Sequence, residues 1–309
     1  HPKKIHRLVF VLCIMALISA SELGALGKDE FVAKLGGLYE NSPWVADRAH
    51  ASGPFTSLNA IHKAMAAVVA QATEEEKLVL LRAHPDLAGK AAVAGQLTAE
   101  STEEQARAGL DALTQEEMDS FTSMNERYKT RFGWPFILAV RNATKSTILG
   151  AFKGRMDSSP SIERDECLRQ VDKIAWMRLL TVAWPAETGF LTCHVLDTAR
   201  GCPADGLRIT LHKLSDKEGL GARELVGDFV TNSDGRLASG PALKGAAFTT
   251  GVYEWTFFAG DYFAAKAVPS AGQPFLDVVP LRFGIDNPED HYHVPLLASP
   301  WSFSTYRGS

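Results

Sequence analysis

The sequence is poor in cysteine and in net charge. Its 309 residues include four cysteines and carry a formal net charge of −4. Cys13, Cys167, Cys193 and Cys202 match no zinc or redox spacing, so we expect a reducing compartment, with a Cys193–Cys202 disulfide as the open alternative. The weak charge gives no sign of the basic surface that a nucleic-acid partner requires, and we expect no such partner.

The sequence also lacks an apolar run long enough to span a membrane. Its longest run, residues 8–18, falls short of the roughly 20 apolar residues that a span needs. The run follows a basic stretch at 3–7 and precedes small residues at 19–21, which is the layout of a secretory signal peptide. Because the chain starts with His1 rather than Met, a mis-joined or unprocessed leader is the alternative. We assign residues 1–27 to this leader or targeting-like segment and expect no stable membrane span in the mature protein.

What remains has the composition of an ordinary globular protein and the length of two domains. Hydrophobic residues make up 46% and charged residues 22% of the chain, and single domains cluster at about 100–150 residues. Two patterns of hydrophobic residues divide the chain. The pattern predicts an all-α domain over residues 28–183 and a β-sandwich over residues 190–309, with a linker at residues 184–189. The predicted fold class is therefore multidomain α and β.

Helix start signals recur in the first half. Thr73 with Glu76, and Thr114 with Glu117, have the spacing of capping boxes, in which the hydroxyl and the carboxylate satisfy N–H groups of the first turn. Ser159-Pro160 opens a later helix, because proline suits the first turn.

Residues in the second half alternate. Between 207 and 211 the apolar side chains occupy every second position, which predicts a half-buried strand. Residues 252–258 and 275–283 are further candidate strands, and Ser233-Asp234-Gly235 is a turn signal. Short strands separated by turns predict a sandwich.

One histidine stands at a predicted helix end. A helix that starts after Thr73 should end near His84, because Pro85 disfavours helical geometry at the residue before it. The helix dipole there favours a protonated ring, which would make His84 a general acid. On position alone, a histidine that merely caps the helix is the stronger interpretation.

Two more segments combine polar groups with helix ends. In residues 97–105, Ser101 with Glu104, or Thr102 with Gln105, has capping-box spacing, and a helix start there would offer N–H groups to an anion. In residues 131–140, glycine and proline break the preceding helix. The apolar run behind them is most simply core, although its first N–H groups can also hold a substrate carbonyl.

Three ordered blocks in this half resemble the OHCU decarboxylase family, where OHCU is 2-oxo-4-hydroxy-4-carboxy-5-ureidoimidazoline. The blocks read His84-Pro85-Asp86-Leu87-Ala88-Gly89, Leu97-Thr98-x-Glu100-Ser101-Thr102-x-Glu104-Gln105 and Phe132-Gly133-x-Pro135-Phe136-Ile137, with Phe31 and Ser42-Pro43-Trp44 upstream. The resemblance implies an all-helical fold and decarboxylation without a cofactor. Such chemistry is reasonable because the conjugated imidazoline ring can absorb the electrons left by CO₂, and Arg178 would offer a fork to a substrate oxygen.

The same resemblance implies the site residues of the first domain. His84, Glu104 and Arg178 would be catalytic. The implied substrate-binding residues are Pro85, Ser101, Thr102, Glu103, Gln105, Phe136, Ile137, Leu138, Ala139 and Val140.

The second half holds its own candidates. His194 lies on the first strand, and Arg236 follows a turn, where a solvated cation is the ordinary interpretation. In a strand, His291 and His293 would project to one face. Together with His194 they form a set of three possible zinc ligands, but the usual carboxylate or thiolate ligands are not evident, so we expect no metal.

These residues sit in motifs that resemble the transthyretin-like family. The motifs are Cys193-His194-Val195-Leu196-Asp197-Thr198, Gly201-x-Pro203-Ala204, Thr231-Asn232-x-Asp234-Gly235-Arg236 and His291-Tyr292-His293-Val294-Pro295-Leu296-Leu297. The ending Tyr306-Arg307-Gly308-Ser309 is the mark of the enzymatic branch, 5-hydroxyisourate hydrolase. The resemblance implies a sandwich that assembles as a homotetramer through this domain. The implied site consists of His194, Arg236, His293, Tyr306, Arg307, Gly308 and Ser309.

The two resemblances imply consecutive reactions. One chain would hydrolyse 5-hydroxyisourate to OHCU and decarboxylate OHCU to (S)-allantoin, in the ureide pathway of urate catabolism. The family implies a peroxisome or the cytosol, whereas the leader resembles a secretory one. The alternatives are a metal hydrolase built on the histidines and a transthyretin-like binding or scaffold protein without catalysis.

Overall fold

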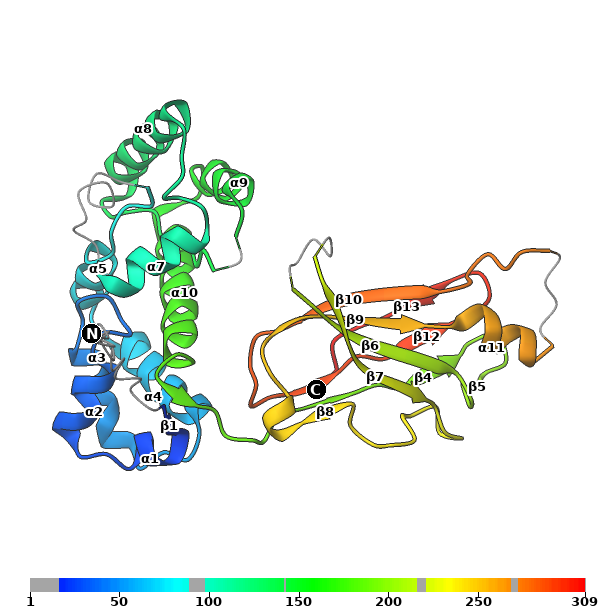
Figure 1. The fold of residues 1–309 in the computed structure, drawn as a ribbon. Helices are drawn as coiled ribbons and strands as arrows, with labels where there is room; N and C mark the ends of the chain where they lie inside the picture. Colours follow the sequence, from blue (N-terminus) through cyan, green and yellow to red (C-terminus); the bar gives the residue numbers. More distant parts are fainter. Residues whose placement is uncertain (1–16, 89–97, 142, 216–220, 268–271, 309) are drawn as a thin grey trace, which may run out of the picture.

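The structure, a computed structural model, describes residues 17–88, 98–141, 143–215, 221–267 and 272–308. Figure 1 shows a helical unit and a β unit joined by one short connection. The helical unit comes first in the chain and the β unit second, as the sequence predicts.

The helical unit is built from helices of one to five turns. They are α1 (Ala20–Gly24), α2 (Lys28–Leu35), α3 (Trp44–Ala49), η1 (His50–Ser52), α4 (Leu58–Gln71), α5 (Glu74–Arg82), α7 (Ala99–Arg107), α8 (Gln115–Phe132), α9 (Lys145–Arg155) and α10 (Pro160–Leu179). Both predicted capping boxes are present, at Thr73 and at Thr114, and α10 begins at the predicted proline. Among the described helices, none is both long and apolar enough to cross a membrane.

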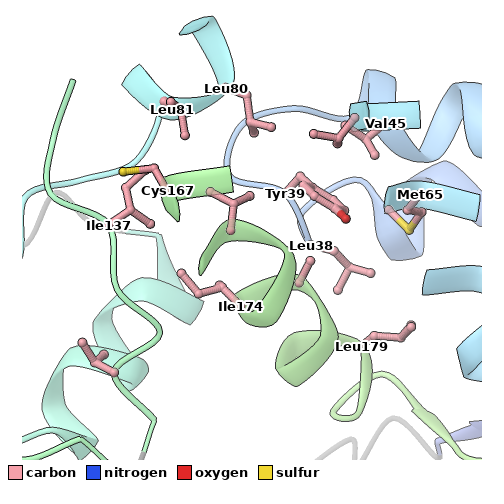
Figure 2. Packing of buried hydrophobic residues seen from close by; sticks show 14 of the residues in the cluster. Leu38, Tyr39, Val45, Met65, Leu80, Leu81, Ile137, Cys167, Ile174 and Leu179 are labelled. Carbon is pink, nitrogen blue, oxygen red and sulfur yellow. The ribbon is translucent and has the colours of Figure 1, made fainter. Parts of the chain in front are cut away.

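Helix α10 forms the centre of the helical core. Cys167, Ile174 and Leu179 on this helix are buried, and Figure 2 shows them between the loop that carries Tyr39 and the extended segment that carries Ile137. Because α10 is surrounded, its polar residues Gln170 and Arg178 are buried as well, and both require partners inside the protein.

The start of the described chain packs onto this unit. Strand β1 (Ile18–Ser19) pairs in parallel with β2 (Ala183–Trp184), at the end of α10. Ala20 and Leu23 of α1 are buried in the helical core. Residues 17–27 therefore belong to the packing of the helical unit, while residues 1–16, with the signal-like run, lie outside the described residues.

The β unit is a sandwich of short strands. They are β3 (Phe190–Thr192), β4 (Val195–Asp197), β5 (Cys202–Pro203), β6 (Arg208–Leu214), β7 (Arg223–Val230), β8 (Leu243–Lys244), β9 (Gly251–Phe257), β10 (Val279–Ile285), β11 (His291–His293), β12 (Leu296–Ala298) and β13 (Phe303–Ser304). One sheet has the order β10-β9-β6-β7 and is antiparallel. The core between the sheets is aromatic, with Tyr253, Trp255 and Phe257 almost fully buried.

The second sheet consists of two patches, β11-β3-β8 and β13-β12-β4-β5. Strands β3 and β4 follow each other in the chain and pair in parallel with β11 and β12. Pro295 lies between β11 and β12, and a proline cannot donate to the ladder. The interruption falls beside His194, a predicted site residue.

One predicted strand of the β unit needs correction, and one helix was not predicted. The strand predicted from 275 begins at Val279 instead, because the preceding backbone pairs elsewhere: Leu276 donates to the Pro300 carbonyl at 3.3 Å and the Asp277 carbonyl accepts from Gly260 at 2.7 Å. A helix that the sequence pattern did not predict, α11 (Ala259–Ala265), follows β9. A 3₁₀ turn, η2 (Gly245–Ala247), follows β8.

The two units are joined by more than the linker. The carboxylate of Glu289, before β11, accepts hydrogen bonds from the N–H groups of Leu58 (2.9 Å) and Asn59 (2.7 Å) at the start of α4. It also accepts one from Ala186 in the linker, at 2.7 Å. Trp176 of α10 adds a hydrogen bond to the Asp286 carbonyl at 3.0 Å. A buried carboxylate therefore fixes α4, the linker and the β unit at one point.

Candidate active sites

A pocket in the helical unit collects most of the predicted decarboxylase residues. Its space, with the open mouth included, is about 360 Å³. The lining residues are His84, Pro85, Leu87, Ser101, Glu104, Gln105, Phe136, Ile137, Leu138, Val140, Ile174 and Arg178. Leu87 and Ile174 were not predicted. The predicted residues Thr102, Glu103 and Ala139 do not line this pocket, because they lie on other sides of the same segments.

His84 lies just past the end of α5, where the sequence places it. Its Nδ1 contacts the Leu80 carbonyl at 2.9 Å. A carbonyl only accepts, so Nδ1 carries the hydrogen, and in the neutral ring Nε2 keeps its lone pair. The protonated form expected from the helix dipole is wrong for the free protein. Burial is the main reason that the pKa of His84 is lowered, to about 4; the Arg178 charge acts in the same direction, while the Leu80 carbonyl and Glu40 oppose the shift.

Arg178 and Glu104 form an ion pair in the wall of the pocket. Arg178 donates from Nε and from a terminal nitrogen to the two oxygens of Glu104, at 2.9 Å each. Its other contacts are Ser101 Oγ at 3.2 Å, the Gly37 carbonyl at 3.3 Å and Glu40 at 2.9 Å. The guanidinium is therefore surrounded by protein acceptors. The sequence predicted that Arg178 offers two N–H groups to a substrate oxygen. In the structure, oxygens of the protein already accept from these N–H groups.

Glu40 is a site residue that sequence reasoning missed. Its side chain is 2% exposed, and its carboxylate accepts from the hydroxyls of Thr98 at 2.9 Å and Ser101 at 3.0 Å. A buried carboxylate must be paired, and here Arg178 supplies the positive charge. The available signal was an acidic residue two positions before the Ser42-Pro43-Trp44 block, directly after the apolar pair Leu38-Tyr39.

Helix α7 starts one turn earlier than either predicted capping box. Thr98 is the N-cap and accepts from the Ser101 N–H at 3.3 Å. Ser101 is thus inside the helix, where its hydroxyl points to Glu40. Gln105, one turn on, accepts from the Ala88 N–H at 2.9 Å and so ties α7 to the loop after His84. Side chains of α7, rather than free N–H groups at its start, face the pocket.

The extended segment 135–140 forms the apolar wall of the pocket. Helix α8 ends at Phe132, as the predicted break requires. Arg155 of α9 donates to the Ile137 carbonyl at 2.8 Å, and its guanidinium lies 4.5 Å from the centre of the Phe136 ring. Gln170 of α10 accepts from the Ala139 N–H at 3.0 Å. The Ile137 carbonyl and the Ala139 N–H are thus held by protein side chains, and the side chains of Phe136, Ile137, Leu138 and Val140 line the pocket.

The hydrolase candidates gather on the β unit through strand register. Residue pairs Phe190↔His291 and Thr192↔His293 lie opposite each other in the parallel pairing of β3 with β11. Leu191 and Cys193 point into the core, so Thr192 and His194 project to the other face. The rings of His194 and His293 have centroids 6.5 Å apart.

Arg236 reaches the same face from the turn after β7. Its backbone pairs with that of His194 in an isolated antiparallel bridge. Gly235 makes this approach possible, because its φ is +71° and a Cβ there would lie 2.3 Å from the Val195 carbonyl oxygen. Burial, and next the Arg236 charge, lower the pKa of both His194 and His293. Both rings are accordingly neutral near pH 7.

The end of the chain closes this site on one side. Gly308 and His293 exchange backbone hydrogen bonds at 2.8 and 3.3 Å. A Cβ on Gly308 would lie 2.9 Å from the His293 ring, so only glycine permits this contact. Arg307 lies over the Tyr292 ring at 4.3 Å, Tyr306 is exposed, and Ser309 lies outside the described residues.

Metal and disulfide alternatives were also left by the sequence. In the described part of the chain, no group of three histidine, cysteine, aspartate or glutamate side chains has a geometry that could hold a metal ion. Cys193 is buried in the core, and both Cys193 and Cys202 are free thiols. Cys13 lies outside the described residues.

Comparison with known families agrees with this division of the chain. Residues 24–180 match the OHCU decarboxylase family, and residues 191–308 match the HIUase/Transthyretin family. A 5-hydroxyisourate hydrolase 2 of Rhizobium meliloti is 55% identical over 124 residues, which is 40% of this chain and 99% of that protein. The chain belongs to both families.

Other known proteins are similar to the helical unit alone or to nearly the whole chain. A 2-oxo-4-hydroxy-4-carboxy-5-ureidoimidazoline decarboxylase of Halalkalicoccus jeotgali is 39% identical over 173 residues, covering 56% of this chain and 96% of that protein. A crystal structure of (S)-allantoin synthase superimposes with a TM-score of 0.80 at 50% identity, covering 94% of this chain and all of the other. The similarity therefore includes the order in which the two units are fused.

Proposed function

We propose that the chain is a bifunctional enzyme of urate catabolism. It hydrolyses 5-hydroxyisourate to OHCU in the β unit and decarboxylates OHCU to (S)-allantoin in the helical unit. The observation that carries the proposal is that each unit assembles its own family's motif residues at one site, in a chain that resembles (S)-allantoin synthase along 94% of its length.

In the helical unit, we assign the proton transfer to His84. Loss of neutral CO₂ from a carboxylate takes up one proton overall. A bound substrate carboxylate next to His84 favours the protonated ring, so the ring takes up that proton at Nε2 on binding. The electron pair of the broken carbon–carbon bond enters the conjugated ring, and His84 then delivers the proton to one face. Delivery to one face gives one allantoin enantiomer.

Glu104 and Arg178 act in this scheme as a fixed pair at the pocket wall. Because Arg178 is held by Glu104, Glu40 and Ser101, its charge stays in place while the substrate reacts. Such a preorganised charge stabilises the developing anion without having to reorient. Pro85, Gln105 and the side chains of 136–138 and Val140 define the shape of the pocket around the ring.

In the β unit, His293 and His194 orient and deprotonate a water molecule. Their neutral state near pH 7 is what a general base requires. Arg236 is exposed on the same face and can hold the urate-like oxygens and the oxyanion. Attack by water opens the six-membered ring of 5-hydroxyisourate and gives OHCU. The terminal residues Tyr306 to Ser309 border the site.

We also propose that the β units assemble as a homotetramer with the sites between subunits. Support comes from large apolar side chains that are exposed in the last residues of the β unit. Trp301 is 62%, Phe303 45% and Tyr306 59% exposed, which is unusual for a surface without a partner. For location, the family resemblance supports a peroxisome or the cytosol.

Circular dichroism of urate supplied with fresh urate oxidase tests the function. Wild-type chain should build up one allantoin enantiomer faster than buffer alone. His84→Ala should stall at OHCU, and His194→Ala should stall at 5-hydroxyisourate. Each variant is a control for the other, because a variant of one unit leaves the other site intact.

Two other outcomes would contradict the proposed function. Decay no faster than in buffer would exclude the bifunctional enzyme and favour a transthyretin-like binding protein. Activity of the β unit that a chelator removes would favour the metal hydrolase instead.

A further inference from the structure

Thr192 occupies a position in the hydrolase site that the family motifs did not bring to attention. It lies directly opposite His293 in the pairing of β3 with β11, on the same face of the sheet as His194. His291 projects to this face as well, two residues before His293, and its ring stacks on Phe190 with centroids 4.2 Å apart. The threonine hydroxyl is thus placed between two histidine rings.

The hydroxyl contacts both rings at hydrogen-bond distance. Thr192 Oγ1 is 2.9 Å from Nδ1 of His293 and 2.8 Å from Nε2 of His291. A hydroxyl has one hydrogen, so between two neutral rings it donates to one and accepts from the other. The two tautomers are therefore linked: if Nδ1 of His293 carries a hydrogen, Nε2 of His291 does not.

A general base at His293 selects one of the two arrangements. Nε2 of His293 must hold a lone pair to accept a proton from water, so its Nδ1 carries the hydrogen and donates to Thr192. The threonine hydroxyl then donates to Nε2 of His291. The three groups form a chain of hydrogen bonds with one direction, from the reacting water to His291.

We infer that Thr192 and His291 form a proton relay behind His293, an inference that rests on the hydrolase function proposed above. As Nε2 of His293 takes a proton from the attacking water, its Nδ1 proton passes to Oγ1 of Thr192. The hydroxyl proton of Thr192 passes to Nε2 of His291. His293 ends neutral with a hydrogen on Nε2, ready for the departing ring nitrogen, and the return of the proton from His291 restores the starting state.

The charges around the rings favour a transfer of the proton away from His293. Arg236 and His194 face His293 from the neighbouring turn and strand, so a positive charge on His293 would meet the Arg236 charge nearby. The relay moves that charge to the His291 ring, whose centroid lies 6.2 Å from that of His293. Two carboxylates lie near these rings. Asp234, two residues before Arg236, favours a charge on His194, and Asp290, directly before His291, has an oxygen 3.8 Å from a nitrogen of Arg307.

The test compares Thr192→Val, Thr192→Ser and His291→Gln in the full chain. Valine keeps the shape of threonine but has no hydroxyl, serine keeps the hydroxyl, and glutamine can hydrogen-bond but cannot carry the proton. Hydrolysis of 5-hydroxyisourate is measured as kcat and KM over a range of pH. OHCU decarboxylation by the same samples measures the amount of active chain, because none of these residues lies in the helical unit. KM for 5-hydroxyisourate reports whether the β-unit site is still formed.

The relay predicts a loss in kcat. Thr192→Val and His291→Gln should each lower kcat about 10- to 100-fold with KM changed less than about threefold, as loss of proton transfer does. Thr192→Ser should stay within about threefold of wild type, and the Thr192→Val/His291→Gln double variant should be no slower than either single variant. In a plot of kcat against pH, Thr192→Val and His291→Gln should lower the value of kcat at neutral pH.

Three results would overturn the relay. They are an unchanged kcat in Thr192→Val, an equal loss in Thr192→Ser and Thr192→Val, or losses that multiply in the double variant. A wild-type chain that does not accelerate hydrolysis would instead overturn the hydrolase function, and the relay with it.

Discussion

At the residue scale, His84 shows two physical effects in competition. Its position at the end of α5 favours a protonated ring through the helix dipole. The ring is 7% exposed, however, and an imidazolium there would lose most of its hydration. Burial outweighs the dipole because the dipole effect is typically below about 1 kcal/mol, whereas the pKa of His84 falls from 6.5 to about 4.

This shift predicts how stability depends on pH. Below pH 6.5 the unfolded chain binds a proton at His84 that the folded chain does not bind. The free energy of unfolding should therefore fall as the pH drops from 6.5 to 4, by up to about 3 kcal/mol from this residue. His84→Gln removes this contribution, so denaturant unfolding followed by helical ellipticity at pH 4 to 7 should show a shallower dependence in the variant. Parallel curves for variant and wild type would contradict it.

Sequence motifs and the family resemblance predicted residues of the helical unit that the fold brings together. His84, Glu104 and Arg178 line one pocket, as expected. Glu40 and Thr192 escaped notice because their importance depends on what lies opposite them in the fold. Glu40 matters through Arg178, 138 positions along the chain, and Thr192 through the histidines of β11.

At the element scale, helix ends with a strong local signal were predictable: the starts of α5, α8 and α10, and the end of α8. The start of α7 and the whole of α11 were not. Thr73 and Thr114 carry both halves of the box, whereas α7 is capped by Thr98 alone. The hydroxyl of Ser101 lies inside α7 and donates to Glu40. Helix α11 has no start signal of this kind, since its N-cap is Phe258.

The extended segment 135–140 illustrates an element whose geometry is imposed from outside. It makes neither a helix nor a strand, and Arg155 holds it by the Ile137 carbonyl and the Phe136 ring. Arg155 is itself fixed by Glu163, which is 1% exposed and accepts two hydrogen bonds from it, at 2.9 and 2.6 Å. Tyr128 donates to the same Glu163 oxygen.

Weakening this support should impair decarboxylation specifically. Arg155→Lys keeps the charge near Glu163 but loses the two-pronged contact, so the pocket wall can shift. We expect kcat/KM for OHCU to fall about 10- to 100-fold, the effect of a misplacement of about 1 Å, with hydrolysis of 5-hydroxyisourate unchanged.

The matched control is Arg169→Lys. This arginine pairs with Glu166 on the same helix as Glu163, but its side chain is 63% exposed, and exposed pairs contribute little. Equal decarboxylase activity in both variants would show that Arg155 does not position the wall.

At the scale of the whole molecule, the sequence predicted two units and their order but not their contact. The hydrophobic pattern of each half is a local property of the sequence, and each half has its own motifs. The contact joins Glu289 to Leu58, 231 positions apart, and no local pattern marks such a pair. A carboxylate is well suited to this place, since the N–H groups at the start of α4 attract negative charge.

Removing that carboxylate should loosen the molecule at the linker. Glu289 binds Ala186, next to the exposed Glu187, so a protease that cuts after glutamate can reach the linker once the contact opens. Each charge-assisted hydrogen bond contributes about 1.5–3 kcal/mol. A net loss of about 3 kcal/mol makes the open form about 100-fold more populated, and Glu289→Ala should be cleaved faster by that factor where opening limits access.

The fragments identify the site of cutting, because they should end at Glu187 and begin at Thr188. Glu187→Ala in the Glu289→Ala background should abolish this cleavage without restoring the Glu289 contact. This control shows that the cleavage occurs at Glu187. Glu289→Gln should lie between wild type and Glu289→Ala, because the amide keeps one accepting oxygen but no charge. If Glu289→Ala is cut no faster than wild type, then the linker and the other contacts hold the units together without Glu289.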